Sequence, residues 1–170
     1  MKEKAVYLAT GAVIAALYVV LTLVSAAFGM SSGSVQFRIS EALTILPMFT
    51  PAAIPGLFVG CFIANLITPG TVIWDVFFGS IATLIGAFGT YYLGKNKWVA
   101  PLFPIAANVL IIPFVLKYAY QIDRGIGYFM LTVGAGELIT CGFLGILFYQ
   151  TLVKTGIANA IPSKNPRKNK

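Results

Sequence analysis

Hydrophobic residues fill six stretches of this chain, and short polar segments separate them. The stretches run over about residues 5–28, 39–49, 53–67, 72–93, 99–116 and 128–153. An apolar run of about 18 or more residues is typical of a helix that crosses a membrane. The second and third stretches are shorter, which leaves open whether either one crosses fully. The pattern predicts an all-α integral membrane protein with six transmembrane helices.

The composition supports one membrane domain over residues 1–170. Of the 170 residues, 58% are hydrophobic and 10% are charged, whereas an ordinary soluble domain has about 25% charged residues. The first apolar stretch is too long for a typical signal peptide, so we expect it to remain as a helix. The net charge is +7, but no basic face with interleaved aromatic residues accompanies it. We therefore expect no binding of nucleic acid.

The positions of lysine and arginine predict the orientation. If six helices cross and the N-terminus is cytoplasmic, nine of these residues lie in the cytoplasm and three lie outside. Positive charge collects on the cytoplasmic side of membrane proteins. We therefore predict that both termini are cytoplasmic and that residues 154–170 form a basic tail. Four crossings, with 39–49 and 53–67 as a hairpin that stays on one side, would give the same sidedness.

Small residues recur at helical spacing in the first and third stretches. Four of them share one face of the first stretch and are called the alanine stripe: Ala5, Ala9, Ala12 and Ala16. Gly11 and Ala15 form an adjoining step, and Gly56, Gly60 and Ala64 recur every fourth residue in the third stretch. Such faces let helices pack closely within a membrane. We interpret the third-stretch set as internal packing, whereas the alanine stripe fits either internal packing or docking of a partner protein.

Ionisable residues inside a membrane are costly, by about 2.5–3.5 kcal/mol each, and usually serve a ligand or an ion. In the predicted orientation Glu41, Asp75, Asp123 and Glu137 all belong to the outer half, and Glu137 is the deepest. Arg38 and Glu41 can also neutralise each other at i, i+3, and Asp75 can complement a helix dipole. The convergence predicts an outward pocket for a small planar polar ligand. Its candidate residues are Gln36, Phe37, Arg38, Glu41, Asn65, Trp74, Asp75, Asn108 and Glu137.

Several classes of site lack their usual residues. The chain has no histidine, and Cys61 and Cys141 lie singly in apolar stretches, so we expect no metal site, no structural disulfide and no cofactor. It contains no GxxxxGK[ST] phosphate loop, which is typical of ATPases, and it has no histidine to activate a nucleophile of the GxSxG type that is typical of hydrolases. Paired broken helices of a secondary transporter are not evident either. The sequence favours a binding subunit that uses a separate motor over an enzyme.

Two short motifs carry a resemblance to a known family. "VQFRISEALTILP" at residues 35–47, with "GELIT" at 136–140, resembles the QueT family among the substrate-binding S-components of energy-coupling factor (ECF) transporters. The resemblance implies a six-helix bundle that works with a transmembrane T-component and two ATPase subunits. It implies that the alanine stripe docks the T-component and that the protein topples in the membrane to release its ligand inside. The ligand implied is a 7-deazaguanine with an aminomethyl or larger substituent.

The resemblance also suggests a role for each candidate residue. Glu137 would accept hydrogen bonds from the guanine face, and either Glu41 or Asp75 would balance the amine. The remaining roles are hydrogen bonds from Gln36, Asn65 and Asn108, stacking by Phe37 or Trp74, and an outer lid formed by residues 29–37. Two alternatives stay open. One is an S-component for another vitamin such as thiamin or riboflavin, and the other is a stand-alone ion-coupled carrier.

Overall fold

The computed structural model describes residues 2–30 and 37–162, and these residues form helices and connections without a strand. The helices are α1 (Lys2–Ala27), the 3-10 helix η1 (Ile39–Met48), α2 (Ala53–Ile67), α3 (Ile73–Leu93), α4 (Leu102–Tyr118), α5 (Ile126–Glu137), the π-helix η2 (Leu138–Leu144), α6 (Gly145–Lys154) and α7 (Ile157–Ala160). The predicted all-helical class is confirmed. Three helical segments are long and apolar enough to cross a membrane: α1, α3 and the continuous segment Ile126–Lys154. Six crossings remain a prediction.

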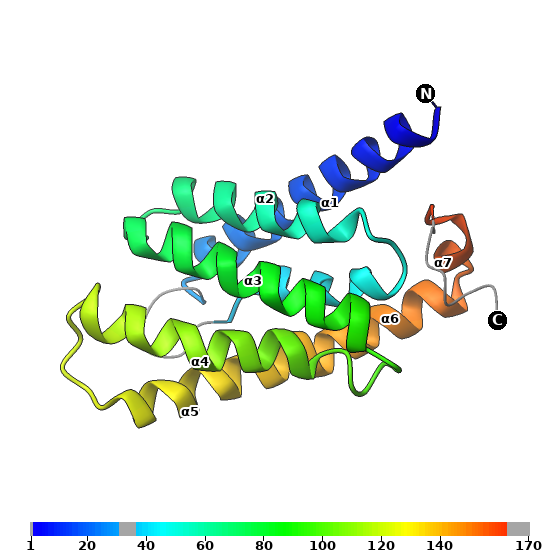
Figure 1. Ribbon diagram of the computed structural model, residues 1–170. Helices are drawn as coiled ribbons and strands as arrows, with labels where there is room; N and C mark the ends of the chain where they lie inside the picture. Colours follow the sequence, from blue (N-terminus) through cyan, green and yellow to red (C-terminus); the bar gives the residue numbers. More distant parts are fainter. Residues whose placement is uncertain (1, 31–36, 163–170) are drawn as a thin grey trace.

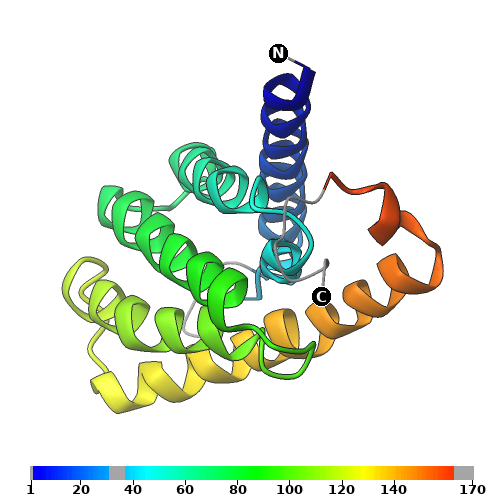
Figure 2. The same cartoon turned by 45° about the vertical axis from the view of Figure 1, so that its right-hand side comes forward.

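The long helices run back and forth between two ends of the bundle (Figures 1 and 2). The start of α1, helix α7 and the α3–α4 connection lie at one end, on the right in Figure 1. The α2–α3 and α4–α5 connections lie at the opposite end. Lys95 and Lys97 belong to the first end, whereas Asp123 and Arg124 belong to the second. This arrangement is compatible with the predicted sidedness, in which the first end is cytoplasmic.

The segment η1 lies in the middle of the bundle, where Ser40 to Pro47 are buried among α1, α3, η2 and α6. A 3-10 helix rises about 2.0 Å per residue, so its ten residues extend about 20 Å. This length is shorter than the roughly 30 Å hydrocarbon core, as the short apolar stretch in the sequence indicated. Pro47 lacks a backbone N–H, and the Thr44 hydroxyl bonds the backbone oxygen of Glu41 at 2.6 Å. Both features fit a segment that departs from a regular α-helix.

Close packing of α1 on α2 depends on glycine. A Cβ atom at Gly56 would lie 2.7 Å from the backbone oxygen of Gly11, and one at Gly60 would lie 2.9 Å from that of Ala15. Real Cβ atoms do not approach backbone oxygen so closely. The predicted internal packing role of the third-stretch residues is confirmed. Every residue of the alanine stripe remains exposed, because α1 buries the adjoining face that carries Gly11, Ala15 and Tyr18.

The last apolar stretch forms one continuous helical segment from Ile126 to Lys154, with a π-helix, η2, in its middle. The π-helix begins directly after Glu137. A π-turn inside an α-helix accommodates one extra residue and is frequent at functional sites. The deepest predicted carboxylate therefore lies where the regular α-helix is interrupted.

Candidate ligand-binding site

Two of the predicted acidic residues, Glu41 and Glu137, lie close to a cysteine inside the bundle. Glu41 of η1, Glu137 of α5 and Cys141 of η2 each place one potential ligand atom within 4.8 Å of the others. We call these three residues the inner cluster. The Glu41 side chain is almost fully buried, at 3% exposure, and Glu137 is partly buried. Residues about 100 positions apart in the chain are therefore brought together, as the predicted convergence of acids requires.

The inner cluster receives its hydrogen bonds from neutral groups. Tyr18 donates its hydroxyl to Glu41 Oε1. Asn108 Nδ2 donates to Glu137 Oε1 at 3.0 Å, and the Cys141 thiol donates to Glu137 Oε2 at 3.0 Å. Glu41 Oε2 is buried and has no hydrogen-bond partner among the described residues. A buried acceptor without a donor is costly, so this oxygen is the atom of the cluster that is most in need of a ligand.

Two polar cavities adjoin these groups. The first, the inner chamber, has a volume of about 20 Å³ and is lined by Arg38, Glu41, Gly79, Thr83, Asn108, Ile112, Val133 and Glu137. The second, the outer cavity, has a volume of about 390 Å³ and is lined by Thr22, Leu23, Ala26, Ala27, Arg38, Asn65, Thr68, Pro69, Gly70, Thr71, Leu116, Tyr120 and Ile122. The inner chamber has room for about one water molecule, whereas the outer cavity has the size of a ligand pocket. Arg38 lines both and therefore lies between them.

Arg38 is held by residues from α2 and α3. Its Nη1 donates to Asn65 Oδ1 at 2.8 Å, and its Nη2 lies 3.8 Å from Asp75 Oδ2. Asp75 Oδ2 also accepts a hydrogen bond from the Tyr120 hydroxyl at 2.6 Å. Burial and the neighbouring Asp75 carboxylate raise the pKa of Tyr120, so its phenol keeps the proton that it donates. The structure therefore places Asp75 in a buried ion pair with Arg38, a role that the sequence did not suggest.

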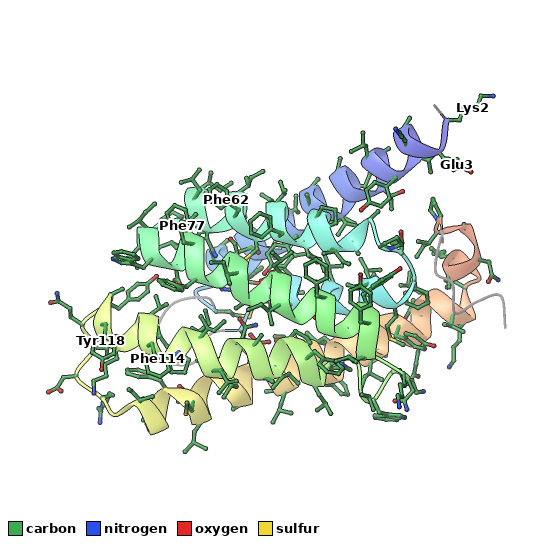
Figure 3. The ribbon with its side chains drawn as sticks, viewed as in Figure 1. Lys2, Glu3, Phe62, Phe77, Phe114 and Tyr118 are labelled. Atoms are coloured by element: carbon green, nitrogen blue, oxygen red, sulfur yellow. The ribbon has the colours of Figure 1, made fainter. Side chains whose placement is uncertain are left out.

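The two aromatic candidates lie elsewhere. Trp74 is 54% exposed and borders an apolar groove of about 670 Å³ that is also lined by Phe114 and Tyr118 of α4 (Figure 3). Phe37 is half-buried, and its backbone N–H donates to the backbone oxygen of Met30. Neither residue lines the inner chamber or the outer cavity. The structure therefore places both aromatic side chains outside the polar cavities.

One candidate and most of the predicted lid fall outside the described residues. Gln36 belongs to the range 31–36, and the predicted lid spans 29–37. Three residues that the sequence did not single out take part in the site: Tyr18, Tyr120 and Cys141. The only signal for Tyr18 was its position on the same face of α1 as Gly11 and Ala15. Tyr120 had no signal, because its partner Asp75 is distant in sequence. Cys141 lies four residues after Glu137, and this helical spacing was a signal that could have identified it.

The inner cluster also has the composition of a cation site. Carboxylates and thiolates bind metal ions, and these three side chains are close enough to surround an ion. They are equally able to accept hydrogen bonds from an organic cation. The expectation that the chain has no metal site therefore stays a prediction, and the geometry supports a positively charged occupant of either kind.

Tyr18 provides a test of how strongly the buried carboxylate depends on its protein donor. Replacing Tyr18 with phenylalanine removes the hydrogen bond to Glu41 Oε1 and leaves a buried charged oxygen without a donor, at a cost of about 1–3 kcal/mol. We expect a lower midpoint of thermal unfolding in detergent. Tyr7→Phe is the matched control, because Tyr7 is exposed and donates over 3.4 Å to Pro51. Equal midpoints for the two variants would show that the buried bond contributes nothing.

A bundle of apolar helices with buried carboxylates beside a cavity is typical of membrane proteins that handle a small polar ligand or an ion. The chain belongs to the QueT transporter family, whose sequence model matches residues 8–154. The resemblance carried by residues 35–47 and 136–140 is thereby confirmed.

A relative with a known name shares part of the sequence. Over 84 residues the chain is 37% identical to the queuosine precursor transporter QueT of Lactococcus lactis subsp. cremoris (strain MG1363). The match covers 49% of this chain and 48% of the relative, so it spans about half the length of that protein. No solved structure matches the chain.

Proposed function

We propose that this protein is the substrate-binding subunit of an ECF-type importer. It captures a queuosine precursor of the 7-deazaguanine type outside the cell, and an ATPase motor drives its delivery inward. Family membership supports transport, and the name of the Lactococcus relative, a queuosine precursor transporter, supports the ligand class. The single observation that carries the proposal is the buried inner cluster next to a cavity of about 390 Å³.

The chemistry of the cavities suits such a ligand. A 7-deazaguanine presents ring and exocyclic N–H donors, and carboxylates accept hydrogen bonds from such donors strongly. The candidate contacts among the described residues are Arg38, Glu41, Asn65, Asp75, Asn108 and Glu137. Arg38 acts as a latch in this proposal, because it separates the two cavities and is held by Asn65 and Asp75. Membership of a transporter family supports a carrier rather than an enzyme.

The alanine stripe is the proposed docking surface for the T-component. Its residues remain exposed although the adjoining face of the same helix packs closely on α2. Small side chains allow a partner helix to approach the backbone within a membrane. The T-component would in turn connect the protein to two ATPase subunits, because no phosphate loop is found in the sequence. Both termini would lie in the cytoplasm.

Two other functions are compatible with the same fold. One is an S-component for another vitamin, such as thiamin or riboflavin. The other is a stand-alone carrier coupled to protons or sodium ions. Uptake into vesicles without any ECF motor would distinguish the second alternative, since the proposed subunit cannot drive uptake alone.

A binding panel tests the proposed ligand. Purified protein is examined by native mass spectrometry with 7-aminomethyl-7-deazaguanine, guanine, thiamin and riboflavin. We expect retention of the 7-deazaguanine with an affinity at least tenfold higher than that of any other compound. Tighter binding of a vitamin would assign the protein to a different S-component class, and binding of none of them would contradict the proposed ligand class.

A further inference from the structure

We propose that the inner cluster binds the positively charged amine of the ligand and that Glu41 determines the selectivity for it. This inference rests on the proposed function, because it concerns the same site. It specifies the substrate as a 7-deazaguanine with a protonated amine on its 7-substituent. It also specifies which end of that ligand enters the protein.

The distribution of charge in the site favours a cation at the inner cluster. Three carboxylates lie at or next to the two cavities: Glu41, Asp75 and Glu137. Arg38 lies between the two cavities. Arg38 forms its ion pair with Asp75, which also receives the Tyr120 hydroxyl. The hydrogen-bond donors to Glu41 and Glu137 described above are a phenol, an amide and a thiol, all of them neutral. Arg38 also lines the inner chamber, but its one guanidinium cannot balance three carboxylates. Buried carboxylates are costly unless a positive charge accompanies them, so the inner cluster favours a cationic ligand group.

The inner chamber has the size of an ammonium group, and the spacing of its carboxylate oxygens also fits one. Its volume of about 20 Å³ suits one water-sized group, and an ammonium group has that size. An ammonium nitrogen donates three hydrogen bonds, at about 2.7–2.9 Å from carboxylate oxygens. One nitrogen can therefore bridge oxygens up to about 5.6 Å apart, and those of Glu41 and Glu137 lie within 4.8 Å. Glu41 Oε2, buried and without a donor, is the acceptor that the amine completes.

The short distance between Glu41 and Glu137 determines the orientation of the ligand in this proposal. A carboxylate oxygen of Glu41 and one of Glu137 lie within 4.8 Å of each other. The two side chains therefore bind the same group of the ligand. The guanine face and the 7-substituent of a 7-deazaguanine point to opposite sides of the ring. With the amine in the inner chamber and the Arg38 side chain displaced from its position between the two cavities, the ring lies in the outer cavity beside Asn65, Thr68 and Thr71. This orientation assigns Glu137 to the amine, whereas the sequence suggested the guanine face.

Two compounds that share the ring and differ in charge test the inference. Affinities of 7-aminomethyl-7-deazaguanine and 7-cyano-7-deazaguanine are measured by titration calorimetry on the purified full chain, with EDTA present to remove metal ions. Wild-type protein should bind the aminomethyl compound at least tenfold more tightly. Glu41→Gln should lower that affinity tenfold or more and change the affinity for the cyano compound by less than about threefold. Asp123→Asn is the control, because it neutralises an exposed carboxylate in the α4–α5 connection.

Each remaining outcome is informative. Equal wild-type affinity for both compounds would overturn the inference and leave the proposed function intact. Binding of neither compound would contradict the proposed function and the inference with it. An equal loss of both affinities in Glu41→Gln would show that Glu41 supports the site as a whole and does not select the amine. If that variant does not fold, the wild-type comparison alone still decides whether the site selects a cation.

Discussion

Glutamine in place of Glu137 is expected to weaken binding of 7-aminomethyl-7-deazaguanine tenfold or more. Glutamine has nearly the same shape as glutamate, but it carries no charge and presents an N–H₂ group in place of one oxygen. In the structure both carboxylate oxygens accept hydrogen bonds, from Asn108 and Cys141, so the new N–H₂ would face a donor. Removing one partner of a buried charge pair costs about 2–5 kcal/mol. Titration calorimetry in detergent measures the change in affinity.

Glu3→Gln is the matched control for this variant. It makes the same chemical change on an exposed side chain in the first turn of α1 (Figure 3), where we expect no change in affinity. The midpoint of thermal unfolding is measured for both variants, so that a loss of fold is not mistaken for a loss of binding. An unchanged affinity in folded Glu137→Gln would remove Glu137 from the site.

Leucine at both Ala12 and Ala16 is expected to abolish uptake while ligand affinity stays within about twofold of the wild type. Both alanines are exposed on α1, so larger side chains there do not disturb the packing on α2. They would, however, separate the backbones of α1 and a docked helix, and such membrane contacts depend on close approach. Uptake of labelled ligand is measured in vesicles that contain the T-component and the ATPases, and affinity is measured on the isolated protein.

Val6 and Leu17 provide the control positions. They are also exposed on α1 but lie off the alanine stripe, so phenylalanine at both should leave uptake nearly unchanged. Loss of ligand binding in the double leucine variant would show that the stripe takes part in internal packing. Normal uptake by that variant would show that the motor docks elsewhere. Uptake in vesicles without the motor would favour an ion-coupled carrier.

The helices were predictable where the sequence carries strong breaks. The stretch predicted at 53–67 is observed over the same residues, since proline and glycine bound it on both sides. The stretch predicted from residue 99 begins instead at Leu102. The side chain of Asn96 accepts the backbone N–H groups of Trp98 and Val99 and holds these residues in a turn. Hydropathy alone does not detect such a turn.

The types of the short helices were less predictable. Hydrophobicity does not distinguish a 3-10 helix or a π-helix from an α-helix, because all three bury apolar residues at similar spacing. In η1 the presence of Pro47 was a local signal, whereas η2 had none. The two irregular segments contact each other and carry Glu41 and Cys141 of the inner cluster, whereas Glu137 is the last residue of α5. The sequence therefore identified two acids that the structure brings together, without showing the type of helix that carries them.

The polar residues of the site were predicted better than their partners. Charge inside an apolar stretch identifies Glu41 and Glu137, because burying a charge requires a reason. Which partner each residue contacts depends on how the helices rotate and pack. The ion pair of Arg38 with Asp75 therefore had no signal in the sequence, although the spacing of Arg38 and Glu41 had suggested a local pair.

The glycine contacts between α1 and α2 have a mechanical consequence. The backbones of α1 and α2 lie in close contact at Gly11 and Gly56, without a long side chain between them. We therefore expect the two helices to move together as one rigid unit. A load applied to the exposed side of α1 is transmitted into α2, where Asn65 holds the Arg38 guanidinium. A force on the surface thus reaches the barrier between the two cavities through a short rigid linkage.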